Sequence, residues 1–461
     1  MGLLLWKDVC GNLLLERLDM VDMMEWREEY ERKLITPEKA VKLIKSGDHV
    51  AFAYGLEPQD LGLALIARAG EIRNIRLYVP APGRDFPWYE PGWEETFEVT
   101  VGYILPVVRK MSEEKRGDYM VSGLLWAEDP AIREPVDVLL IYLSTPDEHG
   151  YCSFGASLWD KKKAVRAAKL VLAEVNPNLI RTYGDNYIHV SEIDYFVPHT
   201  PTGRALGATD ILGRKTSGPT EVEKTIAGYI GSVIKNGDTF EVGVGGAAEW
   251  ILQLGTLENK QDLGVHSENL PRGTASLVMK GVITGRFKTL NPGKVVSTAC
   301  GGGTKEEMDF IHMNPTFELY GPDYVLDPRV IAAHDNMVAI NSALTVDLTG
   351  QIAAESIGPS MISGTGGQLA FAIGANLSKG GRNIIVLRST AQGGKVSRIV
   401  PQLQSGTVVT VPRTLADIII TEYGIASLKG KTQRQRAEEL IAIAHPDFRS
   451  ELRREAQRLF F

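Results

Sequence analysis

Short apolar runs alternate with stretches of helical periodicity along most of the chain. Val138–Leu143 is apolar throughout, as expected for a strand buried on both faces. Residues 61–69 instead repeat apolar positions at helical spacing. We expect further strands near residues 49–54, 75–79, 167–175, 239–244, 263–266, 295–298, 338–344, 383–387 and 407–410, with helices between them, including one at 249–254. This alternation predicts an α/β fold built on mainly parallel sheets.

The same pattern occurs twice. Ile44, Lys45, Gly47, Asp48 and Gly55 recur as Ile234, Lys235, Gly237, Asp238 and Gly245, always 190 positions later. In both places a helix end, a Gly-Asp turn, a strand, a glycine, a helix and a second strand follow one another. Chance agreement is the alternative, since Gly-Asp turns before strands are common. The shared order favours two tandem open α/β domains with Gly55 and Gly245 at equivalent strand ends.

A Pro-, Gly- and Thr-rich segment, residues 197–221, lies between the two patterns and is the expected linker. We therefore predict an N-terminal domain at 25–215 and a C-terminal domain at 216–461. Residues 25–45 have helical character, with Thr36 and Pro37 as an N-cap and first turn. Residues 1–23 are expected to form a weakly ordered extension.

Composition narrows the class of protein. The 461 residues carry a net charge of −7, which gives no electrostatic case for nucleic acid or anionic membranes as partners. No stretch is long and apolar enough for a membrane span, and no signal-peptide pattern is present. The three cysteines, Cys10, Cys152 and Cys300, have no metal-site or disulfide spacing. We expect a cytoplasmic protein without a metal.

Glu268 is the first candidate for chemistry, because it follows the apolar run at 263–266, where a buried strand would emerge into a loop. Ligands of open α/β sheets bind at such strand ends, and a carboxylate there can act as base or nucleophile. The alternative is a solvated turn glutamate, which is the common case. Two glycine-rich loops, residues 243–247 and 363–368, could bring backbone amides to a phosphate, or could be simple tight turns. Lys379 could add charge, or be an ordinary surface lysine.

Several stretches together resemble the acetyl-CoA hydrolase/transferase family, and within it the 4-hydroxybutyrate and butyryl-CoA:acetate CoA-transferases. The stretches are TPDEHGYCS at 145–153, LGVHSE at 263–268, DNMVAINSA at 335–343, DLTGQ at 347–351, SGTGGQ at 363–368, GGKVSRIVP at 393–401, TEYGIA at 421–426 and IAHP at 443–446. The resemblance as a whole covers about residues 25–455, and the combination of these stretches is far more specific than any one of them.

The resemblance implies two CoA-transferase domains with the active site between them, and a homodimer or higher oligomer. It implies that Glu268 is the nucleophile and that Gly55 and Gly367 are candidate oxyanion donors. It also implies a CoA site, for which the candidates are Gly243, Val244, Gly245, Gly246, Ala247, Leu344, Gly364, Gly366, Gly367 and Lys379. No cofactor is expected beyond the substrate coenzyme A.

The expected reaction moves CoA from an acyl-CoA to a short-chain carboxylate through a glutamyl-CoA thioester, with ping-pong kinetics. Two alternatives stay open. A short-chain acyl-CoA hydrolase would use the same glutamate and loops, and a CoA-binding module would need no carboxylate at the thioester. The chain departs from the family at 246–248, Asn269, 300–304 and 326–328, which leaves the acyl preference open.

Overall fold

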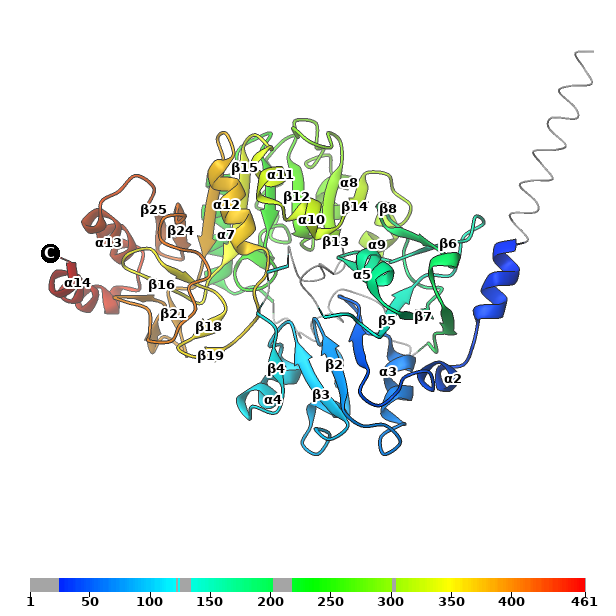
Figure 1. Ribbon diagram of the computed structural model, residues 1–461. Helices are drawn as coiled ribbons and strands as arrows, with labels where there is room; N and C mark the ends of the chain where they lie inside the picture. The colour runs from blue at the N-terminus through cyan, green and yellow to red at the C-terminus, as the bar shows by residue number, and fades with distance from the viewer. Residues whose placement is uncertain (1–24, 122, 125–133, 202–217, 301–303, 461) are drawn as a thin grey trace, which may run out of the picture.

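The structure is a computed structural model that describes residues 25–460 except 122, 125–133, 202–217 and 301–303. Two separate, mainly parallel sheets form two lobes, with the first half of the chain below the second in Figure 1. The predicted α/β class is confirmed. The expected N-terminal extension and most of the expected linker lie outside the described residues.

The first sheet has the strand order β10-β7-β5-β1-β2-β3-β4, and all its described pairings are parallel. Its strands are β1 (His49–Phe52), β2 (Ile75–Val79), β3 (Phe97–Val101), β4 (Asp118–Tyr119), β5 (Val138–Leu143), β7 (Leu170–Val175) and β10 (Tyr195–Pro198). Its helices are residues 25–33, α2 (Pro37–Val41), α3 (Gln59–Ile66), α4 (Arg109–Glu113) and α5 (Lys161–Ala167). The Thr36 hydroxyl caps α2 by accepting from the Lys39 amide at 3.3 Å, as predicted.

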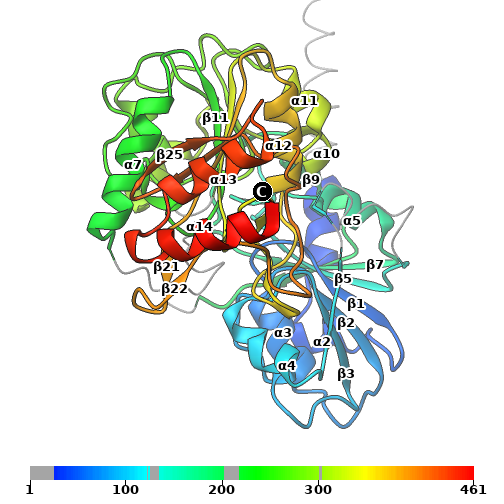
Figure 2. The same ribbon diagram turned by 90° about the vertical axis from the view of Figure 1, so that its left-hand side faces the viewer.

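The second sheet has the order β25-β24-β20-β15-β11-β12-β13-β14-β8 and is parallel except for its β24–β25 edge. Its strands are β8 (Tyr183–Gly184), β11 (Thr239–Val242), β12 (Gly264–Asn269), β13 (Val295–Ala299), β14 (Phe317–Leu319), β15 (Met337–Ser342), β20 (Arg382–Val386), β24 (Ile418–Thr421) and β25 (Gly424–Ser427). Its helices are α7 (Glu221–Val233), α8 (Thr274–Met279), α9 (Lys305–Ile311), α10 (Pro322–Val325), α11 (Pro328–Ala332), α12 (Gln368–Leu377), α13 (Gln433–Ala442) and α14 (Pro446–Phe460). Figure 2 shows α13 and α14 on the outside of this lobe.

Small strand pairs complete the second half and support the loops described below. They are β16 (Thr345–Asp347), β17 (Ile352–Ala353) and β23 (Ile399–Val400) in one sheet, and β18 (Ser356–Ile357) with β19 (Ser360–Met361) in another. In the first half, β6 (Tyr151–Ser153) pairs with β9 (Tyr187–His189). These short elements lie outside the two large sheets.

The two sheets confirm the predicted duplication. The order β7-β5-β1-β2-β3-β4 in the first sheet matches β20-β15-β11-β12-β13-β14 in the second, strand for strand. In each half an aspartate closes the turn before the central strand: Asp48 accepts from the Lys45 amide at 2.7 Å, and Asp238 from the Lys235 amide at 2.6 Å. Gly55 and Gly245 both follow these central strands with positive φ, 114° and 91°. They occupy equivalent strand ends, as predicted.

The halves are not independent bodies. Residues 183–184, from the first half, form β8 and pair with β14 at the edge of the second sheet. One continuous core cluster contains Phe154 and Leu139 from the first half together with Phe240 and Val265 from the second. The strand β8 and the shared core hold the two lobes against each other. A site between the lobes is therefore lined by residues of both halves.

Three predicted elements differ from the structure. Residues 249–254 form no α-helix, because only a short 3-10 turn (Ala248–Trp250) follows the glycine loop. Residues 407–410 form no strand, although Val411 next to them makes an isolated bridge with Ile352. The strand predicted at 263–266 continues to Asn269, so Glu268 lies within the end of β12 and not in a loop.

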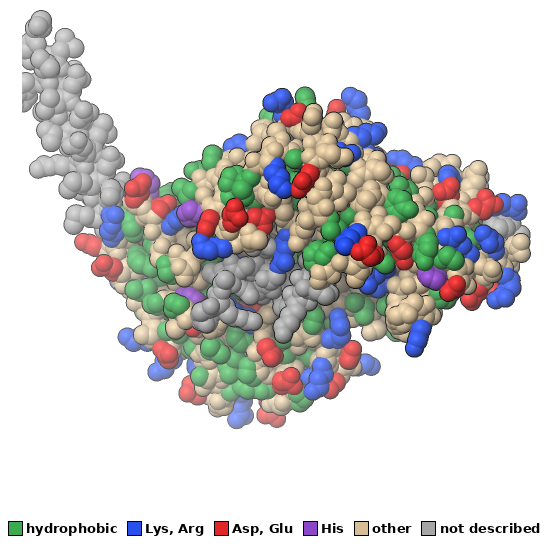
Figure 3. Space-filling view, turned by 180° about the vertical axis from the view of Figure 1, so that it is seen from behind, with side chains coloured by type: hydrophobic (Ala, Val, Ile, Leu, Met, Phe, Trp, Pro, Cys, Tyr) green, Lys and Arg blue, Asp and Glu red, His purple; other side chains and the backbone are tan. Residues whose placement is uncertain are grey.

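None of the described helices is long and apolar enough to cross a membrane. Figure 3 shows positive and negative side chains interspersed over the face turned away from Figure 1, without one large area of a single sign among the described residues.

Candidate active site

The end of β12 places Glu268 at the carboxyl edge of the second sheet, beside β13. The backbone carbonyl of Glu268 accepts a hydrogen bond from the Thr298 hydroxyl, which fixes the strand end. The side chain turns toward the loop before α12, where its Oε2 accepts from the Gly367 amide at 2.6 Å. A strand that is hydrogen-bonded nearly to its last residue therefore holds the carboxylate in one place.

The carboxylate of Glu268 is partly exposed to a cavity and otherwise enclosed by protein. Burial raises the pKa of Glu268 to about 7, although the hydrogen bond from the Gly367 amide acts in the opposite direction. Gly367 has to be a glycine here, because a Cβ would lie 2.3 Å from Oε2 of Glu268. A poorly solvated carboxylate beside a single backbone donor is arranged to react with an electrophile.

Glu241 is a second carboxyl group in the same cavity wall, one strand away on β11. Its Oε2 accepts from the Ile340 amide at 3.2 Å and from the Asn341 side-chain amide at 2.8 Å. Burial, and then the charge of Glu268, raise the pKa of Glu241 well above its usual value. Burial and the charge of Glu268 therefore both favour the neutral acid at Glu241.

His266 lies two residues before Glu268 and has a structural role. Its side chain is fully buried, Nε2 lies 2.8 Å from the Val325 carbonyl oxygen, and its ring packs 4.7 Å from that of His334. Burial, His334 and Lys288 lower the pKa of His266 well below its usual value, so the ring is neutral and donates to the carbonyl. The histidine of the His-Ser-Glu stretch thus lies on the same face of β12 as Glu268, packed against α10 and α12, and is not part of the cavity lining.

The cavity has a volume of about 400 Å³ and lies between the two halves of the chain. It is lined by Glu241, Glu268, the end of β15 and the two glycine loops. The first half contributes Tyr103, Ile104, Leu105, Pro106 and Arg109. A pocket with a few convergent polar groups at a sheet's carboxyl edge is the expected position for a ligand.

Most of the predicted CoA-site residues meet in this cavity. Gly243, Val244, Gly245, Gly246, Leu344, Gly364, Gly366 and Gly367 all line it together with Glu268. Ala247 does not, because it is buried in the core behind the glycine loop. The two predicted loops therefore meet at one cavity, and their contact with CoA stays a prediction.

Besides Ala247, two further predicted site residues are not part of the cavity lining. Lys379 follows α12 at the opposite edge of the sheet, where it pairs with Asp335 at 3.3 Å and its carbonyl accepts from Asn336, just before β15. Lys379 therefore does not line this cavity, because a loop after a helix returns to the amino ends of the strands, and its assignment to CoA stays a prediction. Gly55 lies at a carboxyl edge, yet it packs on Ser157 and is not part of the lining.

Two arginines that the sequence analysis did not single out line the cavity. The side chains of Arg109, from α4, and Arg398, beside β23, have no hydrogen bond or ion pair with any residue that the structure describes. Burial and the neighbouring Arg388 lower the pKa of Arg398, whereas Arg388 itself is paired with Glu223 at 2.5 Å. The charge of Glu422 acts on the pKa of Arg398 in the opposite direction, but no ion pair neutralises either arginine among the described residues. The signal for Arg398 was present in the stretch at 393–401.

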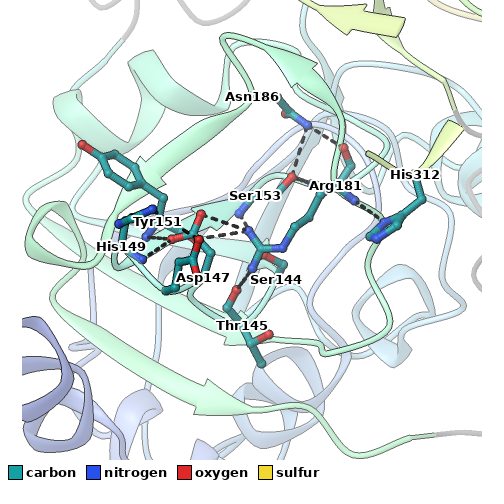
Figure 4. Close-up of polar contacts among 11 residues, drawn as sticks. Ser144, Thr145, Asp147, His149, Tyr151, Ser153, Arg181, Asn186 and His312 are labelled. Carbon is teal, nitrogen blue, oxygen red and sulfur yellow. Dashed lines mark hydrogen bonds and ion pairs between the residues drawn. The ribbon is translucent and has the colours of Figure 1, made fainter. Parts of the chain in front are cut away.

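The stretch at 145–153 is a folded turn away from the cavity, shown in Figure 4. The Asp147 carboxylate accepts from the amides of His149 at 3.0 Å and Tyr151 at 2.9 Å. The Arg181 side chain donates to the Thr145 and Tyr151 carbonyls, and its backbone amide donates to His312 Nδ1 at 3.1 Å. The stretch is therefore held by Arg181, whose backbone amide also links it to the second half through His312.

One group of possible metal ligands exists among the described residues: Asp60, Glu174 and His199, whose ligand atoms lie within 4.8 Å of one another. Glu174 already accepts from the Asp60 amide at 2.8 Å and the Leu61 amide at 3.1 Å, and contacts His199 Nδ1 at 2.7 Å. The Glu174 carboxylate is therefore already used to bind the first backbone amides of α3. We assign no metal to this group.

Comparison with known proteins defines the class. The N-terminal domain model of the acetyl-CoA hydrolase/transferase family matches residues 119–202, and its C-terminal domain model matches residues 303–456. The chain belongs to this family. A protein from Clostridium kluyveri named 4-hydroxybutyrate coenzyme A transferase is 44% identical over 95% of this chain and 100% of its own length.

Two further similarities cover nearly the whole chain. A protein of Anaerostipes caccae named butyryl-CoA:acetate CoA-transferase is 34% identical over 94% of this chain and 98% of its own. The crystal structure of RipA from Yersinia pestis superposes with a TM-score of 0.86 at 33% identity, over 94% of this chain and 99% of that chain. The family and the fold expected from the sequence are both confirmed.

The raised pKa of Glu268 predicts that its ionised form destabilises the folded protein. A carboxyl with a folded-state pKa near 7 stabilises the fold when it is protonated, fully below its unfolded pKa of about 4.5, and this stabilisation is lost as the pH rises through 7. Glu268→Gln should therefore raise the free energy of unfolding at pH 8 by about 1–3 kcal/mol, and the gain should vanish toward pH 4.

Chemical denaturation at several pH values measures this difference. Glu451→Gln is the matched control, because Glu451 is an exposed glutamate on α14. An equal or lower stability of Glu268→Gln at pH 8, relative to wild type, would contradict the desolvated state of this carboxylate.

Proposed function

We propose that the protein is an acyl-CoA:carboxylate CoA-transferase that moves CoA between short-chain acids such as acetate, butyrate and 4-hydroxybutyrate. The observation that carries the proposal is the enclosed carboxylate of Glu268, 2.6 Å from the Gly367 amide, in a cavity lined by glycine loops. The names of the relatives from C. kluyveri and A. caccae support the same substrates.

The reaction balances without a proton transfer. A Glu268 oxygen attacks the thioester carbonyl, the C–S bond breaks, and CoA thiolate leaves a mixed anhydride. The thiolate then attacks the glutamyl carbonyl, releases the donor's carboxylate, and forms a glutamyl-CoA thioester. An acceptor carboxylate then attacks the glutamyl-CoA thioester and releases CoA thiolate, which leaves a mixed anhydride of Glu268 and the acceptor. The thiolate attacks the acceptor's carbonyl, so that the new acyl-CoA leaves and Glu268 is regenerated. A neutral Glu241 and a buried, neutral His266 fit a mechanism that needs no general base.

The Gly367 amide has a defined part in this scheme. It donates to Glu268 Oε2 in the resting state, and the tetrahedral intermediates at the glutamyl carbonyl would place negative charge on that same oxygen. A fixed backbone donor in an enclosed site stabilises such charge without reorganisation. Because the attacking form is the carboxylate, turnover should rise with pH through an apparent pKa near 7.

The two unpaired arginines support CoA as the ligand. CoA carries phosphate groups far from its thioester, and guanidinium groups bind phosphate well. Arg398 is held beside Leu344, since its carbonyl accepts from the Val346 amide at 2.9 Å. We assign Arg398 to the phosphates and the Glu268–Gly367 pair to the thioester. A cytoplasmic location and a homo-oligomeric state remain part of the proposal.

The proposal is tested with purified protein, acetyl- or butyryl-CoA, and a panel of short-chain acids, with both new acyl-CoA and free CoA measured. New acyl-CoA should form only when a carboxylate is added. Glu268→Gln should lower transfer by at least about a thousandfold, because the nucleophile is lost.

Glu241→Gln is the matched control for that measurement, because Gln resembles the neutral acid that Glu241 already is. It should keep transfer within a few-fold of wild type. Free CoA released at the same rate with and without an acceptor acid would instead identify a hydrolase, and no turnover with intact CoA binding would identify a binding module.

A second prediction concerns Arg398. Arg398→Met should raise the KM for acyl-CoA by about tenfold or more, because a charge-assisted contact to phosphate is lost. The KM for the matching acyl-pantetheine, which has no phosphates, should be the same in the variant and in wild type.

Arg453→Met serves as the control, since Arg453 is an exposed arginine on α14. Equal effects of Arg398→Met on both donors would contradict the assignment of Arg398 to the phosphates.

A further inference from the structure

Thr365, two residues before the Gly367 amide, is held at each of its polar atoms. Its backbone amide donates to the Tyr119 hydroxyl at 3.1 Å, and its carbonyl accepts from the Tyr103 hydroxyl at 3.0 Å. Its side-chain hydroxyl donates to Glu355 Oε2 at 2.7 Å. Three separate segments therefore fix one residue of an otherwise glycine-rich loop.

Both tyrosines come from the other half of the chain. Tyr119 ends β4, at the edge of the first sheet, and Tyr103 follows β3. The sequence separations to Thr365 are 246 and 262 residues. The backbones also meet closely here, because a Cβ on Gly364 would lie 2.4 Å from the Gly102 carbonyl oxygen. The loop is thus seated directly on the first half.

Tyr103 approaches the reacting carboxylate as well as the loop. A Cβ built on Gly366 would lie 3.3 Å from the Tyr103 hydroxyl and 3.9 Å from Glu268 Oε2. Burial, then Tyr54 and Glu268, raise the pKa of Tyr103 well above its usual value. The phenol keeps its proton and acts as a donor to the Thr365 carbonyl.

On the other side of Gly366, the loop is fixed by the start of α12. The Gly367 carbonyl accepts from the Phe371 amide at 3.0 Å in the first turn of α12. Between the fixed Thr365 and the fixed helix start, only Gly366 and the Gly367 amide remain to be oriented. Glycine is the most flexible residue, so the direction of this amide depends on contacts at the two ends of the turn.

We propose that Tyr103 and Tyr119 are positioning residues for CoA transfer: by holding Thr365 from the first half, they aim the Gly367 amide at the Glu268 carboxylate. This inference rests on the proposed function. It makes the oxyanion donor on one half of the chain depend on side chains of the other half, although neither tyrosine exchanges atoms with the substrate.

The test measures Tyr103→Phe, Tyr119→Phe and the double variant in the transfer assay across pH. A small displacement of a catalytic donor costs rate, so we expect kcat to fall by roughly tenfold or more in each single variant while the KM for acyl-CoA stays within about twofold. In these variants the hydrogen bond from the Gly367 amide to Glu268 is weakened, and this hydrogen bond is the contact that lowers the pKa of Glu268. The acidic limb of the rate profile should therefore move to higher pH.

Tyr195→Phe is the matched control. Tyr195, like Tyr119, is a partly buried tyrosine packed on the core of the first half, and it should retain wild-type rates and pH profile. Wild-type kcat and an unmoved acidic limb in both tyrosine variants would overturn the inference. The inference would also be overturned if activity fell only in proportion to the fraction of folded protein, while the folded protein kept the wild-type acidic limb.

Failure of the inference is distinguishable from failure of the proposed function. If only the positioning role is wrong, the wild type and the tyrosine variants transfer CoA equally well. If the function is wrong, the wild type itself forms no new acyl-CoA with any acceptor acid, and the inference falls with it.

Discussion

The hydrogen bond from the Gly367 amide to Glu268 is the interaction on which the site depends. It joins the last residues of β12 to the residue that precedes α12 at a distance of 2.6 Å. The carboxylate has lost most of its water, so this one backbone donor opposes the cost of burial that raises its pKa to about 7. The bond leaves room for no side chain on Gly367, which explains why a glycine stands there.

The duplicated fold explains why there is one such carboxylate. In the first half, β1 pairs His49 with Arg76, and in the second half β11 pairs Thr239 with Gly264. Counting four residues on from each partner, the position equivalent to Glu268 is Pro80. Proline has no ionisable group, so the first half keeps the sheet without the nucleophile. It contributes instead the wall at 103–109 and the tyrosines that hold the loop before α12.

The sequence predicted most of the strands, the duplication and the two glycine loops, because these follow from periodicity and from turn residues that act locally. Glu268 was found because it stands at the end of an apolar run. Tyr103 and Arg109 were missed, since their place in the cavity comes from contacts across more than 200 residues. The sequence could not show that Lys379 lies away from the cavity, because composition cannot tell which edge of a sheet a loop faces.

The protonation states in the site follow from the same enclosure. Glu241 and Glu268 share a face of the sheet, and two buried carboxylates so placed do not both ionise easily. The amides of Ile340 and Asn341 only partly offset the burial of Glu241, which stays neutral. His266, on the same face of β12 but buried, and His334 packed against it are neutral as well. Glu268 is the group whose ionisation is poised near neutral pH.

The most direct test of Glu268 as the nucleophile is to identify the residue that becomes bonded to CoA. The protein is incubated with acyl-CoA in the absence of an acceptor acid, and the glutamyl thioester is reduced with borohydride or captured with hydroxylamine. Peptide mass spectrometry should then place the modification on Glu268, and Glu268→Gln should show none. A modification on Glu241 or Glu422, or unmodified protein that turns over rapidly, would contradict the assignment of Glu268 as the nucleophile.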